Sequence, residues 1–262
     1  MSRPARAERD LWGHAELRAG VVLLDYLETL DGQSLDREQG VVPALAAEVE
    51  AGWRRAFGRL ALRFAGGSVD YSGQVQDPND PGSAIAGVWA HGQSIATQLE
   101  AHLQGGALVD PAHRVGVFAG AGLRQWQRSI QSTTVNGYPV AGLNETYGWW
   151  ELELGARVAI LADARDDWEV EAAAVQTVAP RIQVSYQGSN LTLDLGARLG
   201  WRAGTTFRHE FAPPLFVVAG LWGEGYRFGA SAPKPVGGGL EILEPDSRTF
   251  RFGLELGVGA RF

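Results

Sequence analysis

Side chains suited to acid–base or nucleophilic chemistry near neutral pH are few in this sequence. Its histidines are His14, His91, His102, His113 and His209. The nearest histidine–serine pair, His91 and Ser94, would point to opposite faces of a strand, which favours a hydrogen-bonding role over a catalytic dyad. The absence of cysteine excludes thiol catalysis, disulfides, iron–sulfur clusters and cysteine-based zinc sites. We therefore predict no catalytic residues.

Two further segments could hold a ligand, but each has a simpler interpretation. Asp77 to Gly82 offers three oxygen-bearing side chains to a calcium ion, yet its two prolines and its glycine are typical of a turn. The run Gly237-Gly238-Gly239 lacks the following Lys-Ser/Thr of a phosphate-binding loop. We predict no metal and no cofactor.

Arginine and glutamate are more informative, because they alternate with apolar residues throughout the chain and Lys234 is the only lysine. A planar guanidinium binds a carboxylate through two hydrogen bonds and suits confined ion pairs better than a mobile ammonium. We predict that the polar face is enclosed and forms an ion-pair network. Its predicted members are Glu16, Arg18, Glu48, Glu50, Arg63, Glu100, His102, Arg124, Glu151, Glu153, Arg157, Asp194, Arg198, Arg251 and Glu255.

Composition and charge narrow the class of protein. The formal net charge of −7 argues against general nucleic-acid binding. No run approaches the roughly 18 apolar residues of a spanning helix, although a spanning strand needs only about 9–11 residues of alternating character.

The elements that would position these side chains are strands. Even Ala44 to Phe57, the segment most like a helix, fits a period of two better, with Leu45, Val49 and Trp53 on one face. Ala173 to Asn190 is interpreted as one long strand with a bulge near Pro180, followed by a turn at 187–190. The ten candidate strands cover 15–23, 44–57, 59–64, 95–103, 114–124, 150–158, 168–186, 191–202, 215–224 and 250–262. Two shorter strands in the weak region would give twelve, and eight is the other alternative. Connections alternate between short ones, such as 161–167, and longer ones, such as 27–41, 72–84 and 131–144.

Aromatic residues on the apolar face indicate two girdles, as at the two interfaces of a bilayer. We place Trp53, Trp168, Trp201 and Phe262 at one edge, and Trp150 and Phe250 at the other. A cluster of aromatic and basic residues, Trp126 to Arg128 with Tyr147 to Trp150, is expected at the outer rim. It is interpreted as girdle residues with a cation, or alternatively as a patch for glycan or lipopolysaccharide phosphate.

The final segment, Phe250 to Phe262, alternates without a fault and ends on an aromatic residue. It resembles the terminal strand of Gram-negative outer-membrane β-barrel proteins, in which the last aromatic residue is an assembly signal, here Phe262. The resemblance implies an all-β fold, a closed antiparallel up-and-down transmembrane β-barrel of ten strands over residues 1–262, with 1–13 as a flexible periplasmic segment. It also implies outer-membrane lipid, lipopolysaccharide and the barrel-assembly machinery as partners. We expect a monomer that binds no nucleic acid.

Location and function follow as expectations. The first six residues carry no apolar signal-peptide core, which we interpret as the mature form of a protein of the bacterial cell outer membrane. We expect a charged, largely side-chain-filled lumen in a non-enzymatic, porin-like membrane protein that acts as a surface scaffold or narrow channel. One alternative is a hydrolase acting on lipid or peptide at the extracellular rim, with His91, Ser94, Asp70 and Asp77 as candidates. The other is a soluble ligand-binding barrel with its charged face outward.

Overall fold

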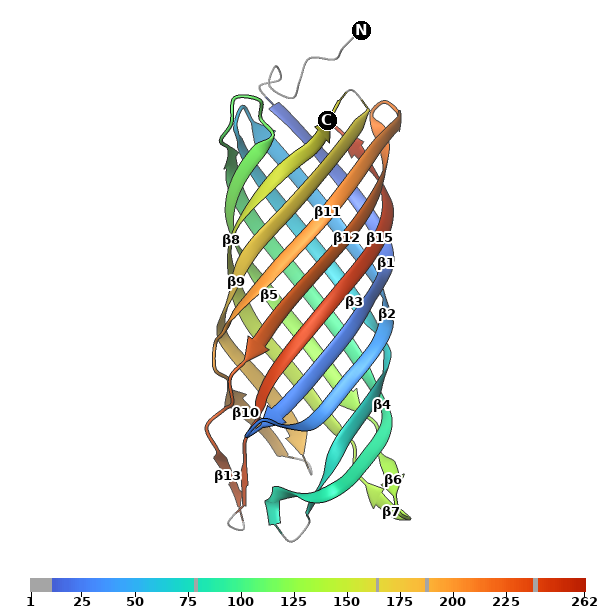
Figure 1. Ribbon diagram of the computed structural model, residues 1–262, viewed down its shortest axis with the longest axis vertical. Coiled ribbons are helices and arrows are strands. Elements are labelled where there is room, and N and C mark those ends of the chain that lie inside the picture. The colour runs from blue at the N-terminus through green and yellow to red at the C-terminus, as the bar shows by residue number, and fades with distance from the viewer. Residues whose placement is uncertain (1–10, 78–79, 164, 187–188, 238–239) are drawn as a thin grey trace.

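The computed structural model describes residues 11–77, 80–163, 165–186, 189–237 and 240–262, which form one closed antiparallel barrel (Figure 1). Its strands are β1 (Leu11–Leu30), β2 (Gln33–Trp53), β3 (Ala56–Asp77), β4 (Asp80–Leu108), β5 (Val115–Ile130), β8 (Leu143–Ala162), β9 (Asp166–Tyr186), β10 (Ser189–Asp194), β11 (Leu199–Ala212), β12 (Leu215–Phe228) and β15 (Asp246–Arg261). Two small hairpins, β6 (Thr133–Val135) with β7 (Tyr138–Val140) and β13 (Lys234–Gly237) with β14 (Leu240–Ile242), lie outside the wall. The described residues include no helix long and apolar enough to cross a membrane.

The wall has ten strand positions, because β10 and β11 share one of them. β10 pairs with the last residues of β9, and β11 pairs with its first half. The barrel closes where β1 pairs with β15 over sixteen residue pairs, from His14 with Arg261 to Thr29 with Asp246. The predicted ten-stranded antiparallel barrel is confirmed.

The two ends of the barrel differ. At one end, called here the terminal end, β1 begins, β15 ends and the turns are short; Gly13 and Phe262 exchange backbone hydrogen bonds there of 3.1 and 3.0 Å. At the other, the loop end, hairpins project beyond the wall (Figure 1). The connection predicted at 27–41 is mostly strand, closed by a two-residue turn in which Asp31 and Gly32 have φ of 51° and 80°. A two-residue turn with both φ positive matches the twist of the paired strands.

The apolar face points outward. Leu254 and Leu256 are 53% and 63% exposed, whereas Glu255 between them is 1% exposed. Val117 is exposed in the same way on β5. A soluble barrel requires the reverse orientation, so that alternative is wrong.

The outward apolar band has a height suited to a bilayer. On β12 the outward residues from Leu215 to Gly225 are all apolar or glycine, and Arg227 follows as the first charged one. Ten residue steps of a tilted strand span about 25 Å along a barrel axis, which is the height of the apolar band in membrane barrels.

Three details of the predicted strands can be compared with the structure. The bulge in the long strand is confirmed, because Ala179 has a φ of 46° and the register between β8 and β9 shifts beside it. β1 begins at Leu11, so residues 11–13 belong to the barrel rather than to a flexible segment; residues 1–10 lie outside the described part. The uninterrupted strand at 191–202 is wrong, because the wall breaks between Asp194 and Leu199.

Candidate functional site

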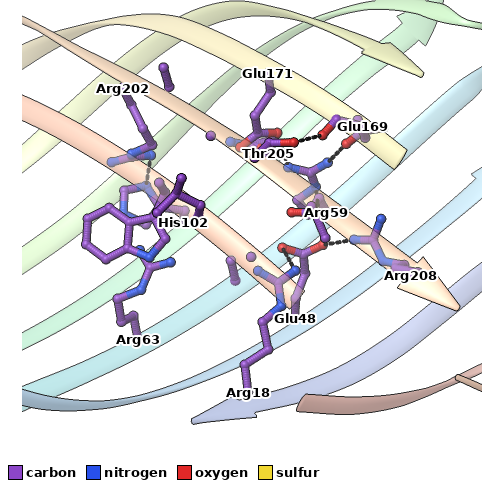
Figure 2. A pocket seen from close by; sticks show the side chains of 18 residues that line it. Arg18, Glu48, Arg59, Arg63, His102, Glu169, Glu171, Arg202, Thr205 and Arg208 are labelled. Atoms are coloured by element: carbon purple, nitrogen blue, oxygen red, sulfur yellow. Dashed lines mark hydrogen bonds and ion pairs between the residues drawn. The ribbon is translucent and has the colours of Figure 1, made fainter. Parts of the chain in front are cut away.

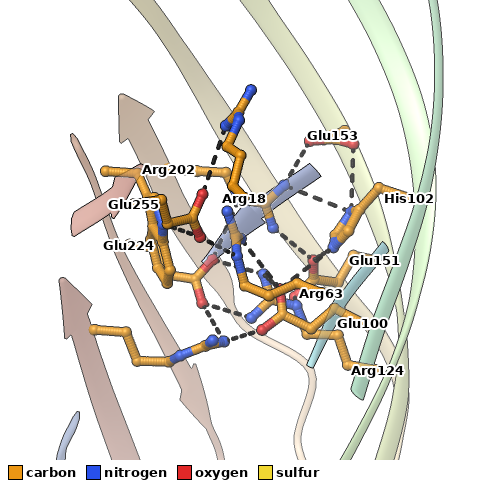
Figure 3. A network of polar contacts seen from close by, with 12 residues as sticks. Arg18, Arg63, Glu100, His102, Arg124, Glu151, Glu153, Arg202, Glu224 and Glu255 are labelled. Atoms are coloured by element: carbon orange, nitrogen blue, oxygen red, sulfur yellow. Dashed lines mark hydrogen bonds and ion pairs between the residues drawn. The ribbon is translucent and has the colours of Figure 1, made fainter. Parts of the chain in front are cut away.

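The middle of the lumen holds a network of glutamates and arginines, with His102 against three of the glutamates (Figure 3). Its charged members are Glu100, Glu151, Glu153, Glu224 and Glu255 with Arg18, Arg63, Arg124, Arg202 and Arg251. They come from β1, β3, β4, β5, β8, β11, β12 and β15, so the network crosses the barrel from wall to wall.

Glu224 lies at the centre of these contacts. Arg124 donates to both its oxygens, from Nη1 at 2.5 Å and Nη2 at 2.6 Å. Arg251 Nη1 donates to the same carboxylate at 2.8 Å, and Arg202 Nε does so at 3.2 Å. Three guanidiniums from three strands therefore hold one buried carboxylate, which fixes the relative positions of those strands.

The edge of this network is closed by Trp222. Its Nε1 donates to Glu255 at 2.9 Å, and the Arg63 guanidinium lies 4.1 Å from the centre of its ring. Arg63 Nε donates to Glu255 at 2.9 Å as well. Gly253 makes room for the indole, since a Cβ there would lie 2.3 Å from Trp222.

A second group of ion pairs fills the lumen near the terminal end (Figure 2). Arg59 donates to Glu50 at 3.0 Å, to Glu169 at 3.1 Å and to Glu171 at 2.6 Å. Beside it, Arg208 Nε donates to Glu16 at 2.9 Å. This group continues into the middle network through Arg18, which contacts both Glu16 and Glu255.

A cavity of about 80 Å³ lies between these two groups, and one of about 30 Å³ lies beside it. Gly204 and Gly220 leave the space, and it is lined by the charged residues Arg18, Glu48, Arg59, Arg63, His102, Glu169, Glu171, Arg202 and Arg208. Cavities of this size have room for a handful of water molecules and are too small to form an aqueous pore.

Toward the loop end the lumen is filled by aromatic rings. Trp126 stacks on Tyr147 with ring centres 5.1 Å apart, and Tyr147 stacks on Phe228 at 6.1 Å. Trp149 contacts Phe228 edge-on at 5.0 Å. Tyr26 packs against Trp126 at 4.9 Å. This aromatic layer forms a second closure above the charged network.

Beyond the aromatic layer lies what we call the outer chamber, defined by Arg128 and the carboxylates of Glu28, Asp36, Glu38, Glu145 and Glu244. Arg128 Nη1 contacts Glu28 at 2.9 Å and Glu145 at 2.7 Å, and its Nη2 contacts Asp36 at 2.8 Å. Its Nε lies 3.2 Å from Glu38, a fully buried residue.

Glu244 reaches the outer chamber from the segment between β14 and β15. Tyr147 OH donates to it at 2.5 Å, and its backbone is tied to Ser231 by two hydrogen bonds of 2.8 and 2.9 Å. Burial, together with the negative charges of Glu28 and Glu145, raises the pKa of the Glu244 carboxyl well above its ordinary value. The external segment is thus anchored to the lumen by an acid whose ionisation is disfavoured.

Thirteen of the fifteen predicted lumen residues lie in these two ion-pair groups. Asp194 and Arg198 do not: both side chains point outward, and Asp194 pairs with Arg181 at 3.2 Å on the surface. The break after β10 inverts the alternation, so Leu193 and Leu195 fill the lumen instead, with exposures of 0% and 8%. The residues not predicted as members are chiefly Arg59, Arg128, Arg202, Arg208, Glu169 and Glu224, although their alternation with apolar neighbours would have placed most of them inside.

The predicted girdle residues lie on the outer face, with one error of height. Trp53, Trp168 and Phe262 lie at the terminal end. Trp201 was predicted there too, but it pairs with Gly225, which pairs in turn with Phe250. Trp201 therefore lies beside Phe250 at the opposite edge, because β11 runs eleven residues further before it ends.

The predicted rim patch is also misplaced, since the side chains of Trp126, Arg128, Tyr147 and Trp149 are buried in the lumen, whereas Gln127 and Trp150 are exposed. The arrangement needed by a rim hydrolase is not assembled from the described side chains. Ser94 is fully buried, His91 is exposed, and Asp70 is exposed on the neighbouring strand. The side chain of Asp77 lies outside the described part.

The ligating atoms of His14, Glu16 and Glu48 lie within 4.8 Å of one another, as in a metal site. Both carboxylates are contacted by Arg18 and Arg208. These guanidiniums already neutralise the pair and would repel a metal cation.

No protein-family model matches the chain, and no curated protein matches it. Among solved structures, the outer-membrane protease OmpT from Escherichia coli aligns with 99% of both chains at a TM-score of 0.61 and 10% identity. The translocator domain of the autotransporter NalP from Neisseria meningitidis aligns with 95% of this chain and 88% of its own at a TM-score of 0.42 and 14% identity. Neisserial surface protein A aligns with 95% of this chain and 97% of its own at 0.34 and 10% identity. The last two likenesses have TM-scores below 0.5 and carry no weight. The first concerns the fold alone, because its identity is 10%: the chain has the barrel fold of Gram-negative outer-membrane proteins.

Proposed function

We propose that this protein is a monomeric barrel of the bacterial outer membrane that acts as a non-enzymatic surface scaffold with a closed lumen. One observation carries the proposal: the balanced ion-pair network spans the lumen from wall to wall, and the aromatic layer covers it. A solute would have to displace both. Breaking a buried ion pair on one side costs about 3–5 kcal/mol, so the network resists opening.

The location rests on the outer face of the barrel. The apolar band of Leu215 to Gly225 and its neighbours suits a bilayer, and the terminal strand ends on Phe262, the residue type expected to engage the barrel-assembly machinery. With this orientation the terminal end lies in the periplasm, and the loop end faces the outside, where lipopolysaccharide is the surrounding lipid.

The non-enzymatic assignment is supported by the geometry of the candidate rim residues. Ser94 points into the lumen, whereas His91 and Asp70 point away from it. A nucleophile and its base must lie within hydrogen-bond reach of one another, and these side chains do not.

Planar-bilayer recording tests the proposal. The full chain, folded in detergent and identified as a barrel by its altered gel mobility without boiling, should produce no steady single-channel currents. A general porin treated identically provides the positive control. Reproducible single-channel steps from the folded fraction would contradict a closed lumen and support a narrow channel instead.

A further inference from the structure

Three exposed arginines gather on the outer face at the loop end of the apolar band. Arg227 on β12 and Arg248 on β15 are directly opposite each other across the strand pair. The Arg198 guanidinium joins them, since a Cβ on Gly229, the next outward position after Arg227, would lie 2.7 Å from its Nη2.

These arginines lack the compensation that arginines receive inside the barrel. The structure gives none of the three an ion pair within the part of the chain that it describes. On the neighbouring positions of β1 and β15, Asp25 accepts two hydrogen bonds of 3.1 Å from Arg37, and Asp246 accepts one of 3.1 Å from the Ala230 amide. Like charges directly opposite on paired strands are destabilising, so Arg227 and Arg248 repel each other.

Aromatic rings adjoin the arginines on the side of the apolar band. Trp201 and Phe250 both lie over Gly225, where a Cβ would be 2.7 and 3.0 Å from them. Phe252 lies over Gly223 in the same way, at 2.9 Å. The surface therefore changes from cationic to aromatic along one strand, in the direction of the membrane interior.

We propose that Arg198, Arg227 and Arg248 bind the phosphate groups of lipopolysaccharide in the outer leaflet, while its acyl chains pack on Trp201, Phe250 and Phe252. Guanidinium forks match phosphate oxygens, and clustered arginines at a membrane surface attract anionic headgroups. A phosphate between Arg227 and Arg248 converts their repulsion into two attractions. The inference rests on the outer-membrane location proposed above, but not on the closed lumen.

The test compares the full chain with the double variant Arg227→Gln/Arg248→Gln, each folded in detergent and titrated with lipopolysaccharide. The midpoint of thermal unfolding is measured by gel mobility. The variant should bind on the order of tenfold more weakly, because charged hydrogen bonds are lost. Without lipopolysaccharide it should be at least as stable as the wild type, since the like-charge pair is gone. Arg181→Gln is the matched control, because Arg181 is an exposed arginine at the same end that has its own partner, Asp194.

Two further probes identify the ligand. Dephosphorylated lipopolysaccharide should stabilise the wild type no more than the double variant, and inorganic phosphate at equal concentration should stabilise neither. Unchanged binding by the double variant, an equal loss in Arg181→Gln, or full stabilisation by inorganic phosphate alone would each overturn the lipid site. The proposed function is tested separately, by the folding of the variants and by bilayer recording. The lipid site and the closed lumen can therefore fail independently of one another.

Discussion

The middle network and the outer chamber use the same chemistry in different proportions. In the middle, five glutamates are paired with five arginines. In the outer chamber, the described side chains include five carboxylates and one guanidinium, that of Arg128, which contacts four of them directly, while Glu244 is contacted by Tyr147. Both regions are buried, and only the aromatic layer separates them.

This difference shows two ways of keeping charge inside a barrel. The middle network neutralises itself, so each of its members depends on the others. The outer chamber has an excess of negative charge, which is eased by tyrosine hydroxyls such as those of Tyr26 and Tyr147 and by proton uptake, as the raised pKa of Glu244 indicates. Mutation should therefore be the main influence on the stability of the middle network, whereas the stability of the outer chamber should also depend on pH.

The largest effect is expected from Arg128→Ala, which leaves five buried carboxylates without a cation. We expect the free energy of unfolding at neutral pH to fall by about 5 kcal/mol, the upper part of the range for breaking a buried pair. The measurement is denaturant unfolding of the protein in lipid vesicles. The deficit should shrink at pH 5, because protonated carboxylates need no cation, and a deficit independent of pH would contradict the excess charge of the outer chamber.

A matched pair of substitutions sharpens the comparison. Glu100→Gln removes one acid from the balanced middle network and leaves Arg251 and Arg124 underpaired, so it should cost about 3 kcal/mol. Glu145→Gln makes the same change in the outer chamber, where it relieves repulsion, and should be neutral or stabilising. The same vesicle unfolding assay decides, and equal losses in the two variants would remove the proposed distinction.

A smaller, local effect concerns Glu244 and the segment that carries it. Because its pKa is raised in the docked state, docking is most favourable at acid pH. It weakens as the pH rises from the ordinary pKa of glutamate to the raised one. Hydrogen exchange at the Ser231 and Glu244 amides, corrected for intrinsic rates, should therefore show severalfold weaker protection at high pH. Glu244→Gln should abolish this dependence, and an identical pH profile in the variant would exclude Glu244 as the cause.

The barrel and most of its lumen could be predicted because alternation is a local property of the chain. The order of Leu254, Glu255 and Leu256 is enough to show that the two leucines lie on one face of the strand and the glutamate on the other. The use of arginine in place of lysine indicates that the polar face is the enclosed one. The aromatic layer was not predicted, because Trp126 and Tyr147 lie on the polar parity and their types resemble girdle residues. A girdle residue and a residue of the aromatic layer differ in where along the strand they lie, and the residue type alone does not show that position.

The remaining errors have a common cause. The break between Asp194 and Leu199 inverts the faces without any composition signal, since Leu193, Leu195 and Leu199 are the same residue type on both sides of it. Trp201 was placed at the wrong edge of the membrane because its position along the barrel axis depends on where β11 begins and ends, which the alternation pattern does not show. The position of the break and the ends of β11 both depend on how this segment pairs with β9 and β12, and the local sequence does not show that pairing.

The pairing of β1 with β15 has a consequence for how the molecule is made. Glu16 and Gly259 are neighbours in the finished wall yet stand at opposite extremes of the chain. Until β15 is in place, β1 has one unsatisfied edge, and contacts between residues so distant in sequence form slowly. An unsatisfied strand edge is open to pairing with a wrong neighbour, so the late closure between β1 and β15 exposes β1 to mispairing until the wall is complete.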